Sequence, residues 1–395
     1  MEWMLFFSVF GGAVLLSSLL VPVMIRLAFH YDVLDHPGHH KTHANVHPLL
    51  GGGAIYVSFM CCVLAGIAGL LMARSGHLPW FPNLQLHLSH QYPIFIDAVP
   101  QLVGFLFGGT CIFILGLVDD VRGVGFSYKW KFTVQILAAI VLVSSGVRLE
   151  FLPHPLLNVF VTMLWVVGIT NSFNLLDNMD GLSSGVALIS SLVLATLTIT
   201  QGQTFSALIF LALAGSLLGF LRYNFHPSKI FMGDAGSLFL GFTLASLTVS
   251  SSYVTAQSAT KLPVVIPVLV LGVPLFDTFS VMIIRWQEKR PLFVGDTCHF
   301  SHRLVKLGMS VRQAVLFIDL VSICIGISAI LIPQLNLFES ILVLIQEGLI
   351  FGIITLLMVK GSHWQKMHHS LKQDLAQLRS VHEHNNNGNA RIGVD

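Results

Sequence analysis

Long apolar segments, separated by short polar connections, recur along the whole chain. A helix needs about 20 apolar residues to cross the hydrocarbon core of a bilayer. Proline and glycine inside such a segment are acceptable, because neighbouring helices satisfy the freed backbone groups. The pattern predicts an all-α polytopic membrane protein with about eleven transmembrane helices, at residues 4–28, 49–72, 100–118, 131–147, 155–171, 182–200, 204–221, 236–254, 262–284, 313–333 and 338–360.

The composition supports this fold class. Only 10% of the 395 residues are Asp, Glu, Lys or Arg, and 54% are hydrophobic, whereas soluble proteins carry roughly 25% charged residues. Such a chain lacks the charge of an ordinary soluble enzyme or a disordered protein. The net charge of +2 gives no bulk attraction to nucleic acid, so no nucleic-acid partner is expected. The five cysteines show neither a zinc-binding spacing nor a disulfide framework.

The basic residues are distributed unevenly between the two sides of the predicted membrane domain. All of the 21 lysines and arginines except Arg74, Arg148 and Lys261 lie in or beside alternate connections. The positive-inside rule places this side in the cytoplasm. The N-terminus is then predicted to be periplasmic and the C-terminus cytoplasmic, with an odd number of spans between them.

Most of the acidic residues collect on the same predicted side. A transporter would instead carry polar groups at mid-membrane, in broken helices with repeat symmetry. Residues 1–360 are predicted to form one integral-membrane domain with a cytoplasm-facing active site, and residues 361–395 a tail that is partly an amphipathic helix and then disordered. The predicted active-site connections are residues 29–48, 119–130, 172–181, 222–235 and 285–312.

Three carboxylates in these connections indicate a Mg²⁺ site. Asp119 and Asp120 follow directly on an apolar span, and adjacent carboxylates repel each other unless a cation relieves the repulsion. Asp234 lies beside Gly233, which lets backbone approach a ligand closely. Mg²⁺ binds through one or two carboxylates together with substrate phosphates. The alternatives are a solvated helix end for the adjacent pair and a helix N-cap for Asp234.

Amide and carboxylate groups also cluster in the segment NLLDNMDGL. Asn174, Asp177 and Asp180 lie in it, and this mixture suits a ribose, a base edge or a metal. A polar cap that closes the preceding span is the alternative. Phe231 lies three residues before Asp234 and is predicted either to stack on a base or to pack at the membrane interface.

Two groups of basic side chains suit phosphates. Lys41 and His43 precede the glycine run 51–53, and phosphate groups favour cations together with flexible backbone. His299 and His302 share one face of a predicted helix and have Arg303 beside them, which makes a donor-rich patch for a diphosphate. A zinc site is disfavoured there, because no third ligand stands at a recognised spacing.

Taken together, these motifs resemble the polyprenyl-phosphate N-acetylhexosamine-1-phosphate transferase family, over about residues 4–330. The resemblance is closest to the bacterial branch that uses undecaprenyl phosphate. The motifs that carry it, in family order, are DHPGHHKTHANVHPLLGG, GLVDDVRG with KFTVQILAA, NSFNLLDNMDGL, IFMGDAGSL, and PLFDT followed by HFSHRL.

The resemblance implies a Mg²⁺-dependent reaction, with Mn²⁺ as a substitute. Undecaprenyl phosphate attacks a UDP-N-acetylhexosamine, most simply UDP-GlcNAc, releases UMP and leaves a lipid-diphospho-sugar. This is the first membrane step of a cell-envelope polysaccharide such as the lipopolysaccharide O-antigen, in the bacterial inner membrane. The partners implied are the nucleotide sugar, the lipid phosphate, the lipid bilayer and a second copy in a homodimer.

The same resemblance assigns roles to residues, each at the position that matches a family motif. Asp119 deprotonates the lipid phosphate, and Asp120 and Asp234 hold the metal. The nucleotide-sugar contacts are Asn174, Asp177, Asp180, Phe231 and Arg303, with Phe231 against uracil; the lipid-phosphate contacts are Lys41, His43 and Lys131; and the catalytic histidines are His299 and His302.

Two positions depart from the family pattern. Ser301 stands where this branch usually has a histidine, and His40 stands where an arginine is common before Lys41. A hydroxyl still donates to a phosphate but carries no charge, so we expect activity with altered diphosphate binding or sugar preference.

Three other functions remain open from the residues. One is phosphotransfer from UDP-MurNAc-pentapeptide, and a second is a prenyltransferase that uses acid clusters for diphosphate-bound Mg²⁺. The third is a proton-coupled transporter built around Asp277 and Asp319, two carboxylates predicted inside spans.

Overall fold

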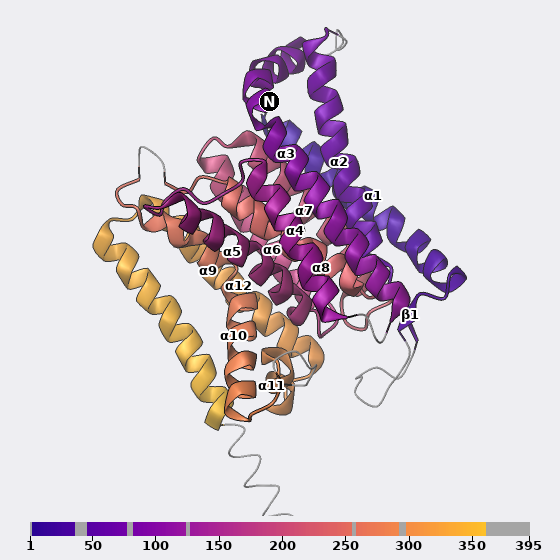
Figure 1. Ribbon diagram of the computed structural model, residues 1–395, viewed down its shortest axis with the longest axis vertical. Coiled ribbons are helices and arrows are strands. Elements are labelled where there is room, and N and C mark those ends of the chain that lie inside the picture. Colours follow the sequence, from indigo (N-terminus) through magenta and orange to yellow (C-terminus); the bar gives the residue numbers. More distant parts are fainter. Residues whose placement is uncertain are drawn as a thin grey trace, which may run out of the picture.

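The chain folds into a bundle of long helices (Figure 1), and the all-α prediction is confirmed. The structure, a computed structural model, describes residues 2–35, 46–76, 82–123, 127–254, 258–291 and 298–360. Within these ranges the one sheet is a two-residue antiparallel pair, β1 (Leu34–Asp35) with β2 (His47–Pro48). The first helices are α1 (Glu2–His30), α2 (Gly51–Arg74), α3 (Pro82–Arg122), α4 (Tyr128–Ser144), α5 (Pro155–Leu176), α6 (Leu182–Thr200), α7 (Thr204–Asn224) and α8 (Gly233–Ser250).

The second part of the chain contains shorter helices and one final long one. Their bounds are η1 (Leu262–Val265), α9 (Ile266–Val270), α10 (Gly272–Gln287), α11 (Phe300–Lys306), α12 (Val311–Leu331), η2 (Ile332–Gln334) and a last helix, Leu337–Lys360. In the described part of the chain, eight helices are long and apolar enough to cross a membrane, or nine if one bent pair is a single span. The protein is therefore a multi-pass membrane protein. Each of the eleven predicted segments overlaps a helix, while the number that cross stays a prediction.

Two predicted segments that contain proline differ from the structure. The predicted span 100–118 is only part of α3, which begins at Pro82 and includes Pro93 and Pro100. The predicted span 262–284 is a bent pair, with 69° between Leu262–Val270 and Gly272–Gln287. Pro274 has no N–H to donate to the carbonyl of Val270, which removes a helical bond at this break.

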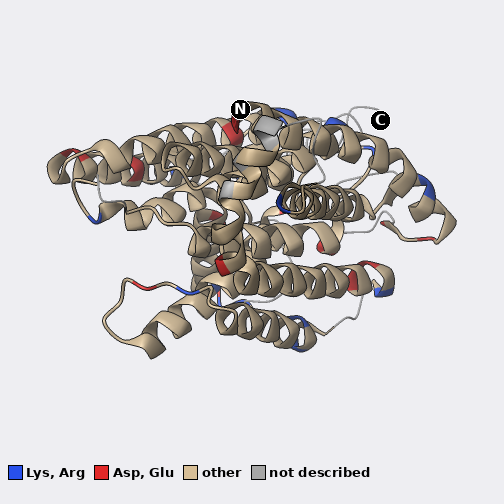
Figure 2. Ribbon diagram, turned by 90° about the horizontal axis from the view of Figure 1, so that it is seen from above, with Lys and Arg blue, Asp and Glu red and all other residues tan. Residues whose placement is uncertain are grey.

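Helix α8 lies among the other helices, and its first turn carries Asp234. All residues from Ala235 to Val249 are buried, and α8 packs against α3, α5 and α2. Small residues allow this: a Cβ on Gly241 would lie 2.6 Å from the Thr170 backbone of α5, and a Cβ on Gly116 of α3 would lie 2.4 Å from the carbonyl oxygen of Asp234. Figure 2 shows the Lys and Arg positions mostly near helix ends. The close packing of α3 and α8 brings the acidic end of α3 to the first turn of α8.

Candidate active site

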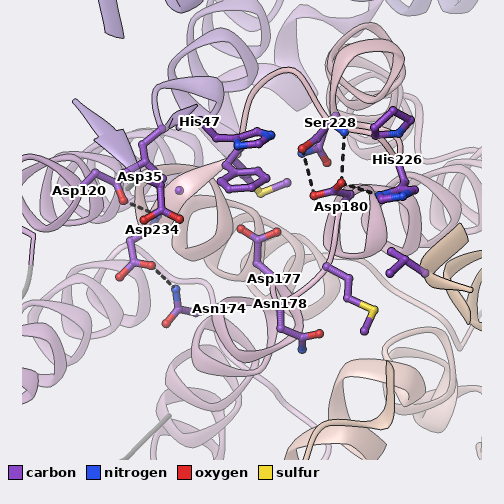
Figure 3. Close-up of a pocket in the computed structure, with 18 of the residues that line it drawn as sticks. Asp35, His47, Asp120, Asn174, Asp177, Asn178, Asp180, His226, Ser228 and Asp234 are labelled. Carbon is purple, nitrogen blue, oxygen red and sulfur yellow. Dashed lines mark hydrogen bonds and ion pairs between the residues drawn. The ribbon is translucent and has the colours of Figure 1, made fainter. Parts of the chain in front are cut away.

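A cavity of about 680 Å³ lies where the end of α3, the α5–α6 turn and the α7–α8 loop meet (Figure 3). Asp120 and Asp234 lie at one end, called here the acidic end, and Asp180 lies beside His226 and Ser228 at the other. Its walls are formed by Asp35, His47, Leu49, Asp120, Asn174, Asp177, Asn178, Met179, Asp180, Asn224, His226, Pro227, Ser228, Phe231, Met232, Gly233, Asp234, His302, Val305 and Val311. Residues from all five predicted active-site connections are therefore joined in one cavity.

Two predicted carboxylates converge on one cation. The Lys131 ammonium donates to Asp234 Oδ2 at 2.5 Å and forms an ion pair with Asp119. The Asn174 side-chain amide donates to Asp234 Oδ1 at 2.9 Å. The position between Asp119 and Asp234 therefore suits a cation held by both carboxylates.

These donors fit a Mg²⁺ ion that keeps several non-protein ligands. Among the residues that the structure describes, no three His, Cys, Asp or Glu side chains are grouped as a metal site. Mg²⁺ usually takes one or two protein carboxylates and completes its octahedron with phosphate oxygens and water. The Asp119–Asp234 pair meets this requirement, because both groups already share the Lys131 ammonium.

Asp120 binds the backbone at the start of α8. Its Oδ1 accepts the Asp234 N–H at 2.7 Å and its Oδ2 accepts the Ala235 N–H at 2.9 Å. These are unpaired first-turn amides of a helix, where a carboxylate is favoured by hydrogen bonding and by the helix dipole. The N-cap considered for Asp234 is thus supplied by Asp120 of α3, and this contact positions Asp234.

The glycine run at the start of α2 packs against the same segment. Gly51 N–H donates to the Phe231 carbonyl at 3.0 Å and Gly52 N–H to the Met232 carbonyl at 2.9 Å. A Cβ on Gly52 would lie 2.3 Å from the Gly236 nitrogen. In this structure the run expected to approach phosphates instead approaches the backbone that carries Asp234.

Asp177 and Asn178 form the floor between the two ends of the cavity. Burial, as the largest cause, and the nearby carboxylates of Asp234 and Asp180 together raise the pKa of Asp177 to about 8. Asn178 Oδ1 accepts a hydrogen bond from the Ser301 hydroxyl at 2.5 Å. The residue that departs from the family pattern therefore links the α5–α6 turn to α11.

Asp180 bonds to the α7–α8 loop. Its Oδ2 lies 2.8 Å from His226 Nδ1 and accepts the Ser228 N–H at 3.1 Å, and its Oδ1 accepts the Ser228 hydroxyl at 3.0 Å. In the structure, Asp180 thus bonds to residues of the chain itself, and its contact with the nucleotide stays a prediction. His226 was not predicted, and its one signal is that it lies five residues before Phe231 in an active-site connection.

The two predicted histidines have different positions. His302 lines the cavity, whereas His299 is only 4% exposed and its Nδ1 lies 2.8 Å from Asp277 Oδ2. Asp277 also accepts the Phe300 N–H at 2.5 Å, and Arg303 donates to the Ser280 hydroxyl at 2.5 Å. His299 and Arg303 therefore fasten α11 to α10, and His302 is the member of the pair that faces the cavity.

Phe231 lines the cavity, and one face of its ring is covered. The His47 ring stacks on it with centroids 4.5 Å apart and planes 5° from parallel. His47 and Asp35 also line the cavity, and the sequence analysis assigned neither residue a role. Lys41, His43 and the tail 361–395 lie outside the described residues.

Comparison with known proteins identifies the family. The sequence profile described as glycosyl transferase family 4 matches residues 102–252. A Bacillus subtilis (strain 168) protein named probable undecaprenyl-phosphate N-acetylglucosaminyl 1-phosphate transferase is 34% identical over 340 residues, which are 84% of this chain and 86% of that protein. The chain belongs to glycosyl transferase family 4. Its resemblance to polyprenyl-phosphate transferases is thereby confirmed.

Two further relatives are similar to this chain over most of its length. The decaprenyl-phosphate N-acetylglucosaminephosphotransferase of Mycolicibacterium smegmatis is 30% identical over 321 residues, 74% of each chain. The phospho-N-acetylmuramoyl-pentapeptide-transferase of Bacillus subtilis (strain 168) is 29% identical over 331 residues, 77% of this chain and 91% of that protein. The protein is therefore a membrane enzyme of family 4 rather than a transporter or a prenyltransferase.

Proposed function

We propose that this enzyme transfers N-acetylhexosamine-1-phosphate, most simply GlcNAc-1-phosphate, from a UDP-sugar to undecaprenyl phosphate and releases UMP. The observation that carries the proposal is the pair of carboxylates, Asp119 and Asp234, that share one cation at the acidic end of the cavity. Phosphoryl transfer depends mainly on positioning and charge neutralisation, and the relatives named for polyprenyl-phosphate substrates carry out this class of transfer.

Asp119 and Asp234 are the residues that would hold Mg²⁺, while Asp120, the ligand expected from the sequence, fixes the backbone beneath Asp234. When bound, Mg²⁺ would supply positive charge that neutralises the phosphates. Asp119 would also accept the proton of the lipid phosphate. Lys131, freed from its bridging position, would neutralise the lipid phosphate together with Lys41 and His43 as the sequence predicts.

The remainder of the cavity would hold the nucleotide sugar. Phe231 offers an aromatic face to the uracil, Asn174 and Asp177 lie between the base and the acidic end, and His302 donates to the diphosphate. Arg303 and His299 support this arrangement by holding α11 in place.

The location and assembly are part of the same proposal. The distribution of basic residues supports a bacterial inner-membrane enzyme with a periplasmic N-terminus, a cytoplasm-facing cavity and a cytoplasmic tail. The lipid product would enter a cell-envelope polysaccharide pathway such as that of the O-antigen. A homodimer and the use of Mn²⁺ in place of Mg²⁺ are expected on the family resemblance.

The test uses purified full-length enzyme, undecaprenyl phosphate and Mg²⁺, with UDP-GlcNAc, UDP-GalNAc and UDP-MurNAc-pentapeptide in parallel. We expect UMP from UDP-GlcNAc and not from the pentapeptide substrate. Release of UDP would mean transfer of the sugar without its phosphate and would refute the proposal, as would release of no nucleotide from any donor. The Asp234→Asn variant should lose turnover by several orders of magnitude at unchanged melting temperature.

A further inference from the structure

The Asp180 carboxylate, which lines the cavity, is bound mainly by the protein itself. It makes three hydrogen bonds, to His226 Nδ1, the Ser228 N–H and the Ser228 hydroxyl, at 2.8, 3.1 and 3.0 Å. All three partners lie in the loop between α7 and α8. The carboxylate therefore holds the His226 ring in a fixed orientation at the cavity wall.

The bond to Asp180 determines which atom of His226 is available. A carboxylate only accepts hydrogen bonds, so Nδ1 of the imidazole carries the hydrogen. The other ring nitrogen, Nε2, then has a free lone pair when the ring is neutral. The His226 side chain lines the cavity and is 40% exposed, so the ring is held in one tautomer at a wall that a ligand reaches.

The loop is already held together without His226. Asn224 Oδ1 accepts hydrogen bonds from the Gly181 N–H and the Ser184 hydroxyl, at 3.1 and 2.9 Å, and its amide donates to the Ile230 carbonyl at 2.9 Å. These bonds join the α5–α6 turn to both ends of the loop. The packing of this region therefore does not require the part-exposed His226 ring.

The position of the ring selects the chemistry of the ligand. Figure 3 shows His226, Asp180 and Ser228 at the end of the cavity away from Asp120 and Asp234. A group at this end is remote from the reacting phosphorus, and a neutral imidazole lone pair accepts a hydrogen bond from a hydroxyl. We propose that His226 Nε2 binds a hydroxyl of the nucleotide sugar, on the ribose or on the hexosamine ring, and that Asp180 is its positioning residue.

This inference rests on the proposed function, because it assumes a nucleotide-sugar donor. The decisive variants are His226→Asn and His226→Gln. An asparagine amide occupies the place of Nδ1 and keeps the bond to Asp180, but it removes the atom that faces the ligand. A glutamine amide reaches the place of Nε2 and gives up the bond to Asp180. A bracing role and a binding role therefore predict opposite orders for the two variants.

The KM for UDP-GlcNAc should rise about five-fold in His226→Asn, the effect of one neutral hydrogen bond. The kcat should stay within two-fold, since the contact is remote from the chemistry. The His226→Gln variant should have a KM closer to that of the wild type. A wild-type KM in His226→Asn, or a larger KM in His226→Gln than in His226→Asn, would overturn the proposal.

Calorimetric binding of UMP and of UDP-GlcNAc distinguishes the two hydroxyl sources. Weaker UMP binding by His226→Asn supports a ribose contact, and unchanged UMP binding with weaker UDP-GlcNAc binding supports a hexosamine contact. Unchanged binding of both ligands refutes any contact by His226. Wild-type enzyme that binds UDP-GlcNAc but releases no UMP would refute the proposed function alone, whereas failure to bind either ligand would overturn both proposals.

Discussion

Replacing Gly116 by alanine should inactivate the enzyme although Gly116 has no chemistry of its own. Gly116 lies on α3, one turn before Asp119 and Asp120, and its Cα faces the first turn of α8. A Cβ at this position would lie 2.4 Å from the Asp234 carbonyl oxygen and 2.5 Å from the Ala235 nitrogen. Ordinary contact begins at 3.4 Å, so the two helices must separate by about 1 Å.

The expected loss of activity follows from which residues this separation moves. Asp119 and Asp120 travel with α3, and Asp234 travels with α8, so the carboxylate pair and the Asp120 cap both loosen. A misplacement of about 1 Å in a catalytic arrangement can reduce the rate about 100-fold. Overpacking a core also destabilises by about 1–3 kcal/mol, partly offset by the roughly 0.5–1 kcal/mol that alanine adds to a helix over glycine.

The matched control is Gly109→Ala on the same helix. A Cβ there would lie 3.4 Å from the Phe239 ring, which is ordinary contact, so this variant gains the same helix propensity without a backbone clash. Steady-state release of UMP and thermal unfolding are measured for both variants. Equal turnover of Gly116→Ala and Gly109→Ala would refute the inference that close packing of α3 on α8 sets the active-site geometry.

Three other perturbations test separate contacts. Lys131→Met removes the ammonium that competes for Asp119 and Asp234, so Mn²⁺ should bind more tightly by electron paramagnetic resonance while turnover falls; weaker Mn²⁺ binding would contradict the shared cation position. Asp177 has a pKa of about 8 in the folded protein and about 4 in the unfolded chain. At a pH between these two values, Asp177 takes up a proton when the protein folds. The metal-free protein should therefore lose stability as pH rises from 6 to 9, and Asp177→Asn should flatten this loss in thermal unfolding; an unchanged slope would exclude Asp177 as its source. Ser301→Ala removes the hydrogen bond that links Asn178 of the cavity to α11, which contributes about 0.5–1.5 kcal/mol. We therefore expect a several-fold higher KM for UDP-GlcNAc in steady-state assays; an unaltered KM would show that the link is dispensable.

Much of the fold could be predicted because it depends on local properties of the chain. An apolar segment of sufficient length forms a helix in lipid whatever its neighbours are, and each of the eleven predicted segments overlaps one. Connections that alternate along the chain lie on the same side of the membrane. The concentration of acidic residues in these connections therefore predicted one common site. The break at Leu271 was harder to predict from the sequence, because prolines elsewhere, such as Pro93 and Pro100, lie inside a continuous helix.

The sequence by itself determined which residue types gather at the site, and only the tertiary structure decided what each one contacts. Asp120 binds an amide 114 residues away, Lys131 reaches a carboxylate 103 residues away, and Asp180 holds a ring 46 residues away. His299 and His302 are three residues apart, yet one is buried on Asp277 and the other lines the cavity. Such pairings depend on how closely helices approach, which is set by side-chain volumes at Gly52 and Gly116 rather than by any local pattern of apolar and polar residues.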